Sequence, residues 1–287
     1  MPTQPEAFFL PASLGRAGQR FCIFHAAQGP LPMGCILYIH PFAEEMNKSR
    51  RMAALQARAL AQAGYAVLQI DLLGCGDSSG DFGDATWQDW INDVVSGWRW
   101  LSEHSQAPLW LWGLRAGCLL AADAARQLEA RCNFMFWAPT MAGKLQLHQF
   151  LRLKAAAELL EGNSKGVTER LRQQLTGGYA VEIAGYTVSP GLALGMDNSI
   201  LAPLPPLPTG GSFRLEWFEM STREDAKPSP AASKTFSEWD AAGFEVCSHM
   251  VRGPSFWQTT EIEDAPALLS ATVAALSTFP LPQKFAA

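Results

Sequence analysis

Short apolar runs alternate with amphipathic helical segments through the first half of this chain, and this alternation constrains the fold most strongly. Residues 33–40, 65–71, 109–112 and 134–138 are nearly unbroken apolar runs, which is typical of strands covered on both faces of a sheet. The segments between them have helical spacing, with the widest apolar stripe between Trp87 and Leu101. Since strands that alternate with helices are joined by right-handed crossovers, the pattern predicts an α/β fold with a mostly parallel sheet and helices on both faces.

The alternation stops after Pro139 and resumes near residue 213. Residues 141–208 contain polar helices, a Gly177-Gly178 break, an extended stretch over 179–188 and a proline-rich exit at 203–208. We interpret residues 141–208 as a lid inserted into a core made of residues 1–140 and 209–287. Outside the first set of runs, the sequence predicts strands at 19–27, 213–220 and 243–251 and helices at 48–63, 87–101 and 265–278.

Composition excludes several kinds of partner. The chain has 22 Lys and Arg residues against 27 Asp and Glu residues, so it lacks the basic excess that nucleic acid binding requires. The six cysteines stand singly, with no Cys-X-X-Cys pair, which indicates a reducing compartment and no metal site. No leader-like N-terminus and no apolar stretch of transmembrane length is present, so we expect a cytoplasmic protein without a transmembrane segment. Nothing in the sequence calls for a cofactor.

One turn between a predicted strand and a predicted helix carries a known motif. The sequence Gly113-Leu114-Arg115-Ala116-Gly117 follows the apolar run 109–112 and precedes a helical pattern. It resembles the nucleophile elbow of α/β-hydrolases, in which small residues flank a strained turn that raises one side chain above the sheet. The resemblance implies an α/β-hydrolase fold, but arginine stands where these enzymes carry serine.

Three longer runs resemble one group within that superfamily. They are residues 40–50 (HPFAEEMNKSR), 71–78 (DLLGCGDS) and 253–261 (GPSFWQTTE). They are similar to the second type of exosortase-A-associated hydrolase, a bacterial α/β-hydrolase-superfamily group associated with exopolysaccharide biosynthesis and protein sorting. The resemblance covers most of the chain and implies a cytoplasmic protein linked to envelope or exopolysaccharide assembly.

The residues needed for serine hydrolysis are not found in their usual places. Arg115 cannot act as a nucleophile, because a guanidinium group stays protonated at physiological pH. Asp225 is a candidate for the acid position, whereas Ser255 stands where the histidine is expected. His249 is the nearest alternative base but lies within a predicted strand, and Cys118 is expected to pack in the core.

Arg115 at the start of a helix forms a strong anion site, which two kinds of group could fill. One is internal: Glu44 or Glu45 could pair with Arg115, because adjacent glutamates beside an apolar turn need a cationic partner if they point inward. The other is a carboxylate or phosphate of a ligand. The predicted ligand-binding residues are Phe42, Glu44, Glu45, Arg115 and Trp257.

Two functions therefore stay open, and the oligomeric state is not predicted. The first is a degenerate hydrolase that keeps some ester or thioester chemistry through Asp225, His249 or Ser255. The second is a non-catalytic binding or scaffold protein for an anionic or acyl-bearing intermediate of exopolysaccharide assembly.

Overall fold

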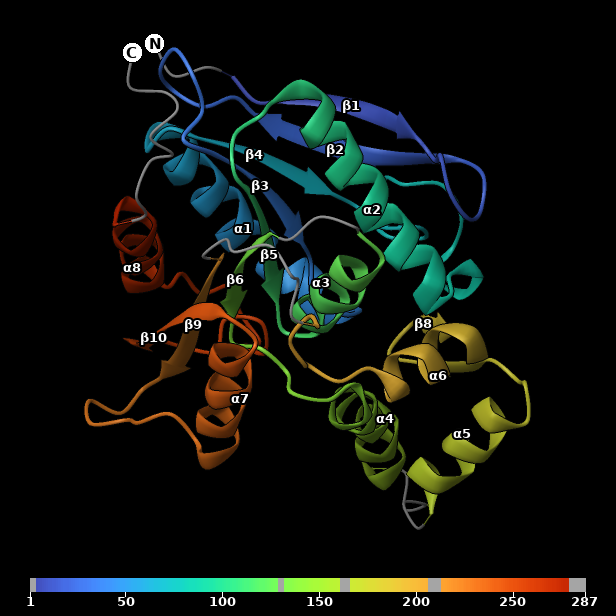
Figure 1. The fold of residues 1–287 in the computed structure, drawn as a ribbon. Helices are drawn as coiled ribbons and strands as arrows, with labels where there is room; N and C mark the ends of the chain where they lie inside the picture. The colour runs from blue at the N-terminus through green and yellow to red at the C-terminus, as the bar shows by residue number, and fades with distance from the viewer. Residues whose placement is uncertain (1–3, 129–131, 161–165, 206–212, 279–287) are drawn as a thin grey trace.

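An eight-stranded sheet organises the residues that the computed structural model describes, which are 4–128, 132–160, 166–205 and 213–278 (Figure 1). Its strand order is β1-β2-β4-β3-β5-β6-β9-β10. The strands from β4 to β10 run parallel, whereas β2 is antiparallel to β4 and β1 to β2. This confirms the predicted α/β fold. The strands are β1 (Glu6–Pro11), β2 (Gln19–His25), β3 (Gly34–Ile39), β4 (Tyr65–Ile70), β5 (Leu109–Leu114), β6 (Asn133–Trp137), β9 (Phe213–Ser221) and β10 (Phe244–Arg252).

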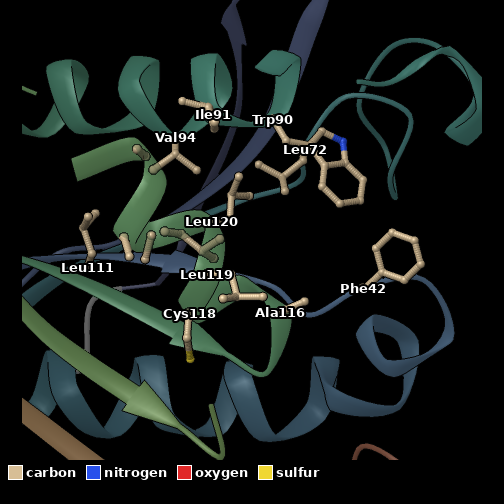
Figure 2. Packing of buried hydrophobic residues seen from close by; sticks show 14 of the residues in the cluster. Phe42, Leu72, Trp90, Ile91, Val94, Leu111, Ala116, Cys118, Leu119 and Leu120 are labelled. Atoms are coloured by element: carbon tan, nitrogen blue, oxygen red, sulfur yellow. The ribbon is translucent and has the colours of Figure 1, made fainter. Parts of the chain in front are cut away.

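Helices cover both faces of the sheet. On one face lie α2 (Trp87–His104), α3 (Ala116–Gln127) and α7 (Pro230–Ala241), and on the other lie α1 (Glu44–Gln62) and α8 (Pro266–Ser277). Figure 2 shows apolar side chains of α2 and α3, including Val94 and Leu120, gathered between the two helices. Burial of side chains of this size contributes about 1.5–3 kcal/mol each, so these layers hold the sheet in place.

Several element boundaries differ from those that the sequence predicts. Helix α1 begins at Glu44 rather than residue 48, so Glu44 and Glu45 lie in its first turn, where acidic side chains interact favourably with the helix dipole. The sequence pattern did not predict β1, a half-exposed edge strand, or α7, which starts at a Ser229-Pro230 step that looks like a loop. Helix α2 begins with a capping box formed by Thr86 and Asp89.

Between β6 and β9 the chain leaves the core and returns, and we call residues 141–201 the insertion. It contains α4 (Gly143–Leu160), α5 (Val167–Thr176), α6 (Pro190–Asn198) and a hairpin of β7 (Val181–Ile183) and β8 (Tyr186–Val188). The helices of the insertion group together at one end of the sheet in Figure 1. Its two ends are joined, because Gly143 N donates to Ser199 O over 2.9 Å and Leu201 N donates to Met141 O over 2.9 Å. Of the predicted proline-rich exit at 203–208, residues 206–208 lie outside the described residues.

The turn between β5 and α3 has the conformation that the Gly-X-X-X-Gly pattern predicts. Arg115 has φ 55° and ψ −119° at its tip, and α3 begins at the next residue. The helix starts so close to β3 that a Cβ atom on Gly117 would lie 2.3 Å from the carbonyl oxygen of Ile39. Only glycine fits there, and this close approach holds the start of α3 against the end of β3.

We expect Gly117→Ala to lower the free energy of unfolding by about 3 kcal/mol, because the added methyl group meets backbone that cannot move aside easily. Urea denaturation followed by circular dichroism measures this change. The control is Gly177→Ala at the end of α5, where φ is −75° and the nearest atom would lie 3.2 Å away, so the loss should stay below about 1 kcal/mol. Equal stability of Gly117→Ala and wild type would contradict the close approach.

Candidate functional site

Three non-glycine residues with positive φ lie at the tip of the β5–α3 turn or next to it. Ala43 (φ 50°) lies between β3 and α1, Arg115 (φ 55°) follows β5, and Ala138 (φ 42°) follows β6. Such a backbone costs about 1–3 kcal/mol per residue and persists only where the surroundings hold it. Here backbone hydrogen bonds do so, since Arg115 N donates to Trp137 O over 3.0 Å and Ala138 N donates to Phe218 O over 2.7 Å. Strained residues gathered at the carboxyl ends of neighbouring parallel strands mark this region as the candidate site.

The guanidinium group of Arg115 has partners on several sides. Its Nε donates to Glu45 Oε1 over 3.3 Å, and its Nη1 donates to the Ala138 carbonyl over 3.4 Å. Nη2 donates to Gln149 Oε1 over 3.2 Å and to Gln146 Oε1 over 3.4 Å, both on α4 of the insertion. The guanidinium carbon also lies 5.5 Å from the ring centroid of Trp257, within the range of a cation–π interaction.

Glu45 is the internal anion that the sequence analysis expected from either Glu44 or Glu45. Its side chain is only 6% exposed, against 13% for Arg115. Burial raises the pKa of Glu45, while the neighbouring Arg115 acts in the opposite direction. Gln146 completes the network, because its Nε2 donates to Glu45 Oε2 over 3.3 Å and its Oε1 accepts from Thr140 Oγ1 over 3.0 Å. The ion pair is therefore closed by protein groups.

Beside this pair lies an open cavity of about 240 Å³, which we call the elbow cavity. It is bounded by the first turns of α1, by α4 and by the loop after β10. Glu44 faces it as a half-buried carboxyl whose pKa is raised by burial. Among the described residues, no group hydrogen bonds with Glu44 Oε2. The lining residues are Glu44, Glu45, Lys48, Gln146, Gln149, Phe150, Leu153, Trp257 and Gln258.

Phe42, a predicted ligand-binding residue, is buried and packs against one of the residues that line the elbow cavity. It is 1% exposed, and its ring centroid is 5.0 Å from that of Phe150, which lines the cavity, and 5.9 Å from that of Trp90. Figure 2 labels Phe42 and Trp90 near Leu72. In this structure Phe42 packs against Phe150 of the cavity wall, and direct contact with a ligand stays a prediction.

The other three catalytic candidates do not assemble around Arg115. Asp225 is 84% exposed beside Arg223, and Ser255 is exposed in the loop after β10. His249 lies on β10, as expected, with its ring stacked on Phe218 and its Nε2 2.6 Å from Glu216 Oε2. Within the described part of the chain, none of the three hydrogen bonds with Arg115 or with another of the three.

Cys118 is a core residue, as the sequence predicts. It is fully buried in α3, and burial raises the pKa of its thiol well above the usual value. Its Sγ lies 3.8 Å from the carbonyl oxygen of Trp137. A thiol in this setting stays protonated and is a poor nucleophile.

No sequence pattern predicted the residues of the insertion that contact Arg115. Gln146 and Gln149 lie on one side of α4, three residues apart, and such a pair on a polar helix looks like an ordinary solvated face. The contact of Arg115 with the Ala138 carbonyl involves a backbone group, which no residue pattern in the sequence could predict. Only the packing of the insertion against the turn reveals these contacts.

The described residues contain no group of three or more His, Cys, Asp or Glu side chains that could hold a metal ion. In the same part of the chain, no helix is both long and apolar enough to cross a membrane.

Comparison with known proteins identifies the family. The α/β-hydrolase family described as serine aminopeptidase, S33, matches residues 31–177, just over half of the chain and including the β5–α3 turn. The chain belongs to this family. A human relative, Protein ABHD12B, is 32% identical over 97 residues, which is 33% of this α/β-hydrolase. The match spans only a quarter (25%) of that relative's length.

Solved structures agree with the fold of this α/β-hydrolase. Est1E from Butyrivibrio proteoclasticus, with bound ferulic acid, is similar with a TM-score of 0.64 and 13% identity, covering 94% of this chain and 96% of its own. A thermostable carboxyl esterase from Bacillus coagulans has a TM-score of 0.60 and 11% identity, with 96% and 98% covered. A monoglyceride lipase from Saccharomyces cerevisiae has a TM-score of 0.56 and 13% identity, with 96% and 95% covered. At such low identity these similarities establish the fold alone.

We expect Arg115 and Glu45 to be energetically coupled. Glu45→Gln should lower the free energy of unfolding by about 3 kcal/mol, because it leaves a largely buried guanidinium without its counter-charge. A double-mutant cycle with Arg115→Gln, measured by urea denaturation, should give a coupling energy of about 1–3 kcal/mol. The same cycle with Glu44→Gln is the control, since Glu44 forms no ion pair with Arg115, and its coupling should stay below about 0.5 kcal/mol. Additive losses for Arg115 and Glu45 would contradict the ion pair.

Proposed function

We propose that this protein is a binding member of the α/β-hydrolase superfamily that has lost serine hydrolysis. It holds a small acyl-bearing ligand in the elbow cavity. The observation that carries the proposal is the Arg115 side chain at the tip of the turn, tied to Glu45 over 3.3 Å. A guanidinium group cannot form an acyl-enzyme intermediate, because it has no lone pair available for attack at physiological pH.

The closed ion pair favours an acyl-bearing ligand over one held mainly by an anionic group. Arg115 already donates four hydrogen bonds to protein groups, so an incoming carboxylate or phosphate would compete with Glu45 for the guanidinium group. The elbow cavity instead offers the apolar side chains of Phe150, Leu153 and Trp257, against which the hydrocarbon part of an acyl group can pack. Its polar rim contains Lys48 and Gln258, which suit the carbonyl or hydroxyl groups of an acyl compound.

In this proposal the insertion acts as a lid on the elbow cavity. We take residues 141–208 as the lid and residues 1–140 with 209–287 as the core. Helix α4 of the lid supplies Gln146, Gln149, Phe150 and Leu153 to the cavity, and the other lining residues come from the core. The lid would then control entry of the ligand.

The proposed setting is the cytoplasm, in association with exopolysaccharide and exosortase systems. All six cysteines are free, which fits a reducing compartment. The proposed association rests on the resemblance of residues 40–50, 71–78 and 253–261 to that group of hydrolases. Residues from the first and last of these runs lie around Arg115. Glu45 comes from the first run and Trp257 from the last, and both contact Arg115. In this setting the ligand is an acyl-bearing intermediate of exopolysaccharide assembly.

We expect wild-type protein to hydrolyse p-nitrophenyl acetate and butyrate no faster than Arg115→Ala, because neither protein has a nucleophile at the turn. Arg115→Ser should also stay within about twofold of background. Among the described residues no histidine hydrogen bonds with Arg115, and the ring nitrogens of the nearby His40 are bonded to Pro41 O and Leu72 N, so no base is placed to accept the serine proton. Release of nitrophenolate measures the rate. Turnover well above background that disappears in His249→Ala would overturn the proposal and support residual hydrolysis.

We expect octanamide, an acyl probe that resists hydrolysis, to bind in the elbow cavity. Leu153→Lys should weaken binding by about tenfold or more, because it places a charge on the apolar wall of the cavity. Leu145→Lys is the matched control, since Leu145 is an exposed leucine of the same helix that does not line the cavity. Isothermal titration calorimetry measures both affinities. Equal effects of the two substitutions, or no binding by wild type, would contradict the proposed site.

A further inference from the structure

A second cavity lies on the other side of α1, away from the elbow cavity. It has a volume of about 170 Å³ and lies between α1 and the strands β2, β3 and β4. We call it the α1 cavity. The two cavities share no lining residue, so the α1 cavity is not an extension of the candidate site described above.

The walls of the α1 cavity are mostly apolar. Phe21 and Ile23 of β2, Met46 and Ala53 of α1, and Ile70 of β4 contribute them. Water gains few hydrogen bonds against such walls, and an apolar cavity of about 150 Å³ is large enough for a benzene ring. The cavity therefore suits one small ring or a short branched chain.

At one end of the α1 cavity lie polar groups with unused hydrogen-bonding capacity. Tyr38 is 5% exposed and lines the cavity, and no described residue hydrogen bonds with its hydroxyl group. Asp71 is 8% exposed and lines the same end. It uses only Oδ2, which accepts from Arg50 Nη2 over 3.0 Å and from Asp77 N over 3.2 Å. A hydroxyl group and a carboxylate oxygen that have no protein partner are free to hydrogen bond with a ligand in the cavity.

The charges at this end oppose a charged ligand. Arg50 and Asp71 pair with each other, so an anion would lie against Asp71 and a cation against Arg50. His40 adds no charge, because its Nδ1 donates to Pro41 O over 2.8 Å, its Nε2 accepts from Leu72 N, and burial lowers its pKa. A neutral hydroxyl group fits better, since it can donate to Asp71 Oδ1 and accept from the Tyr38 hydroxyl.

From these observations we infer that the α1 cavity is a second binding site, which takes a small neutral molecule with one apolar ring and one hydroxyl group. The site is independent of the proposed function of the elbow cavity. Arg50, whose side chain is 42% exposed, lies where the cavity meets solvent and leaves a route for entry.

Phenol and toluene are the probes for this inference, because they share a ring and differ in the hydroxyl group. Ligand-detected NMR titration of the full chain should show that phenol binds more tightly than toluene. Tyr38→Phe should weaken phenol binding by about fivefold to tenfold, the loss expected for one hydrogen bond, and should change toluene binding by less than about twofold. Tyr186→Phe is the control, since this tyrosine lies in the insertion and does not line the cavity.

A second variant tests the location of binding. Ala54→Phe fills the cavity from a half-exposed position of α1 and should abolish binding of both probes, while circular dichroism confirms that the variant is folded. Octanamide binding to Ala54→Phe should match that of wild type, which separates this site from the elbow cavity. Phenol binding that persists in folded Ala54→Phe, equal affinities of wild type for phenol and toluene, or tighter binding of benzoate than of phenol would each overturn the inference.

Discussion

The guanidinium group of Arg115 joins four separate parts of this protein at one point. It contacts Glu45 at the start of α1, the carbonyl after β6, two glutamines of α4 and the ring of Trp257 after β10. A buried cation needs such partners, because removing it from water costs several kcal/mol that only opposite charge and hydrogen bonds can offset. The positions of the first turn of α1, of the insertion and of the last loop around the turn therefore depend on the chemistry of this one side chain.

Under the proposed function, the same interaction explains how an enzyme fold can keep its architecture without its usual reaction. The strained turn, the glycine that permits the close approach of α3 to β3, and the parallel strands around them are all present. In a serine hydrolase this geometry presents a nucleophile to the substrate. Here it presents a cation, and the protein satisfies that cation internally. The strain that elsewhere serves catalysis is retained because surrounding backbone hydrogen bonds hold it, and the space beside the turn remains as a cavity lined by Phe150, Leu153 and Trp257.

Helix α1 has a separate environment on each side. Towards the insertion, its first turn supplies Glu45 to the ion pair and Glu44 to the elbow cavity. Towards β2 and β4, Met46, Arg50 and Ala53 border the second cavity, where Tyr38 and Asp71 have hydrogen-bonding capacity to spare. These two groups can hydrogen bond with a ligand that enters the cavity. Their presence in a cavity with apolar walls is the physical reason for assigning a ligand there.

Local patterns in the sequence determined the fold class, most strands and helices, and the conformation at Arg115. Runs such as 109–114 are buried on both faces of a parallel sheet, and a turn of small residues between a strand and a helix permits few conformations. Only the tertiary structure decided which glutamate pairs with Arg115. Glu44 and Glu45 are neighbours with the same chemistry, and the helix that begins at Glu44 turns them in different directions. Gln146, Gln149 and the second cavity were likewise decided by packing, because contacts between segments separated by many residues leave no periodic pattern in a sequence.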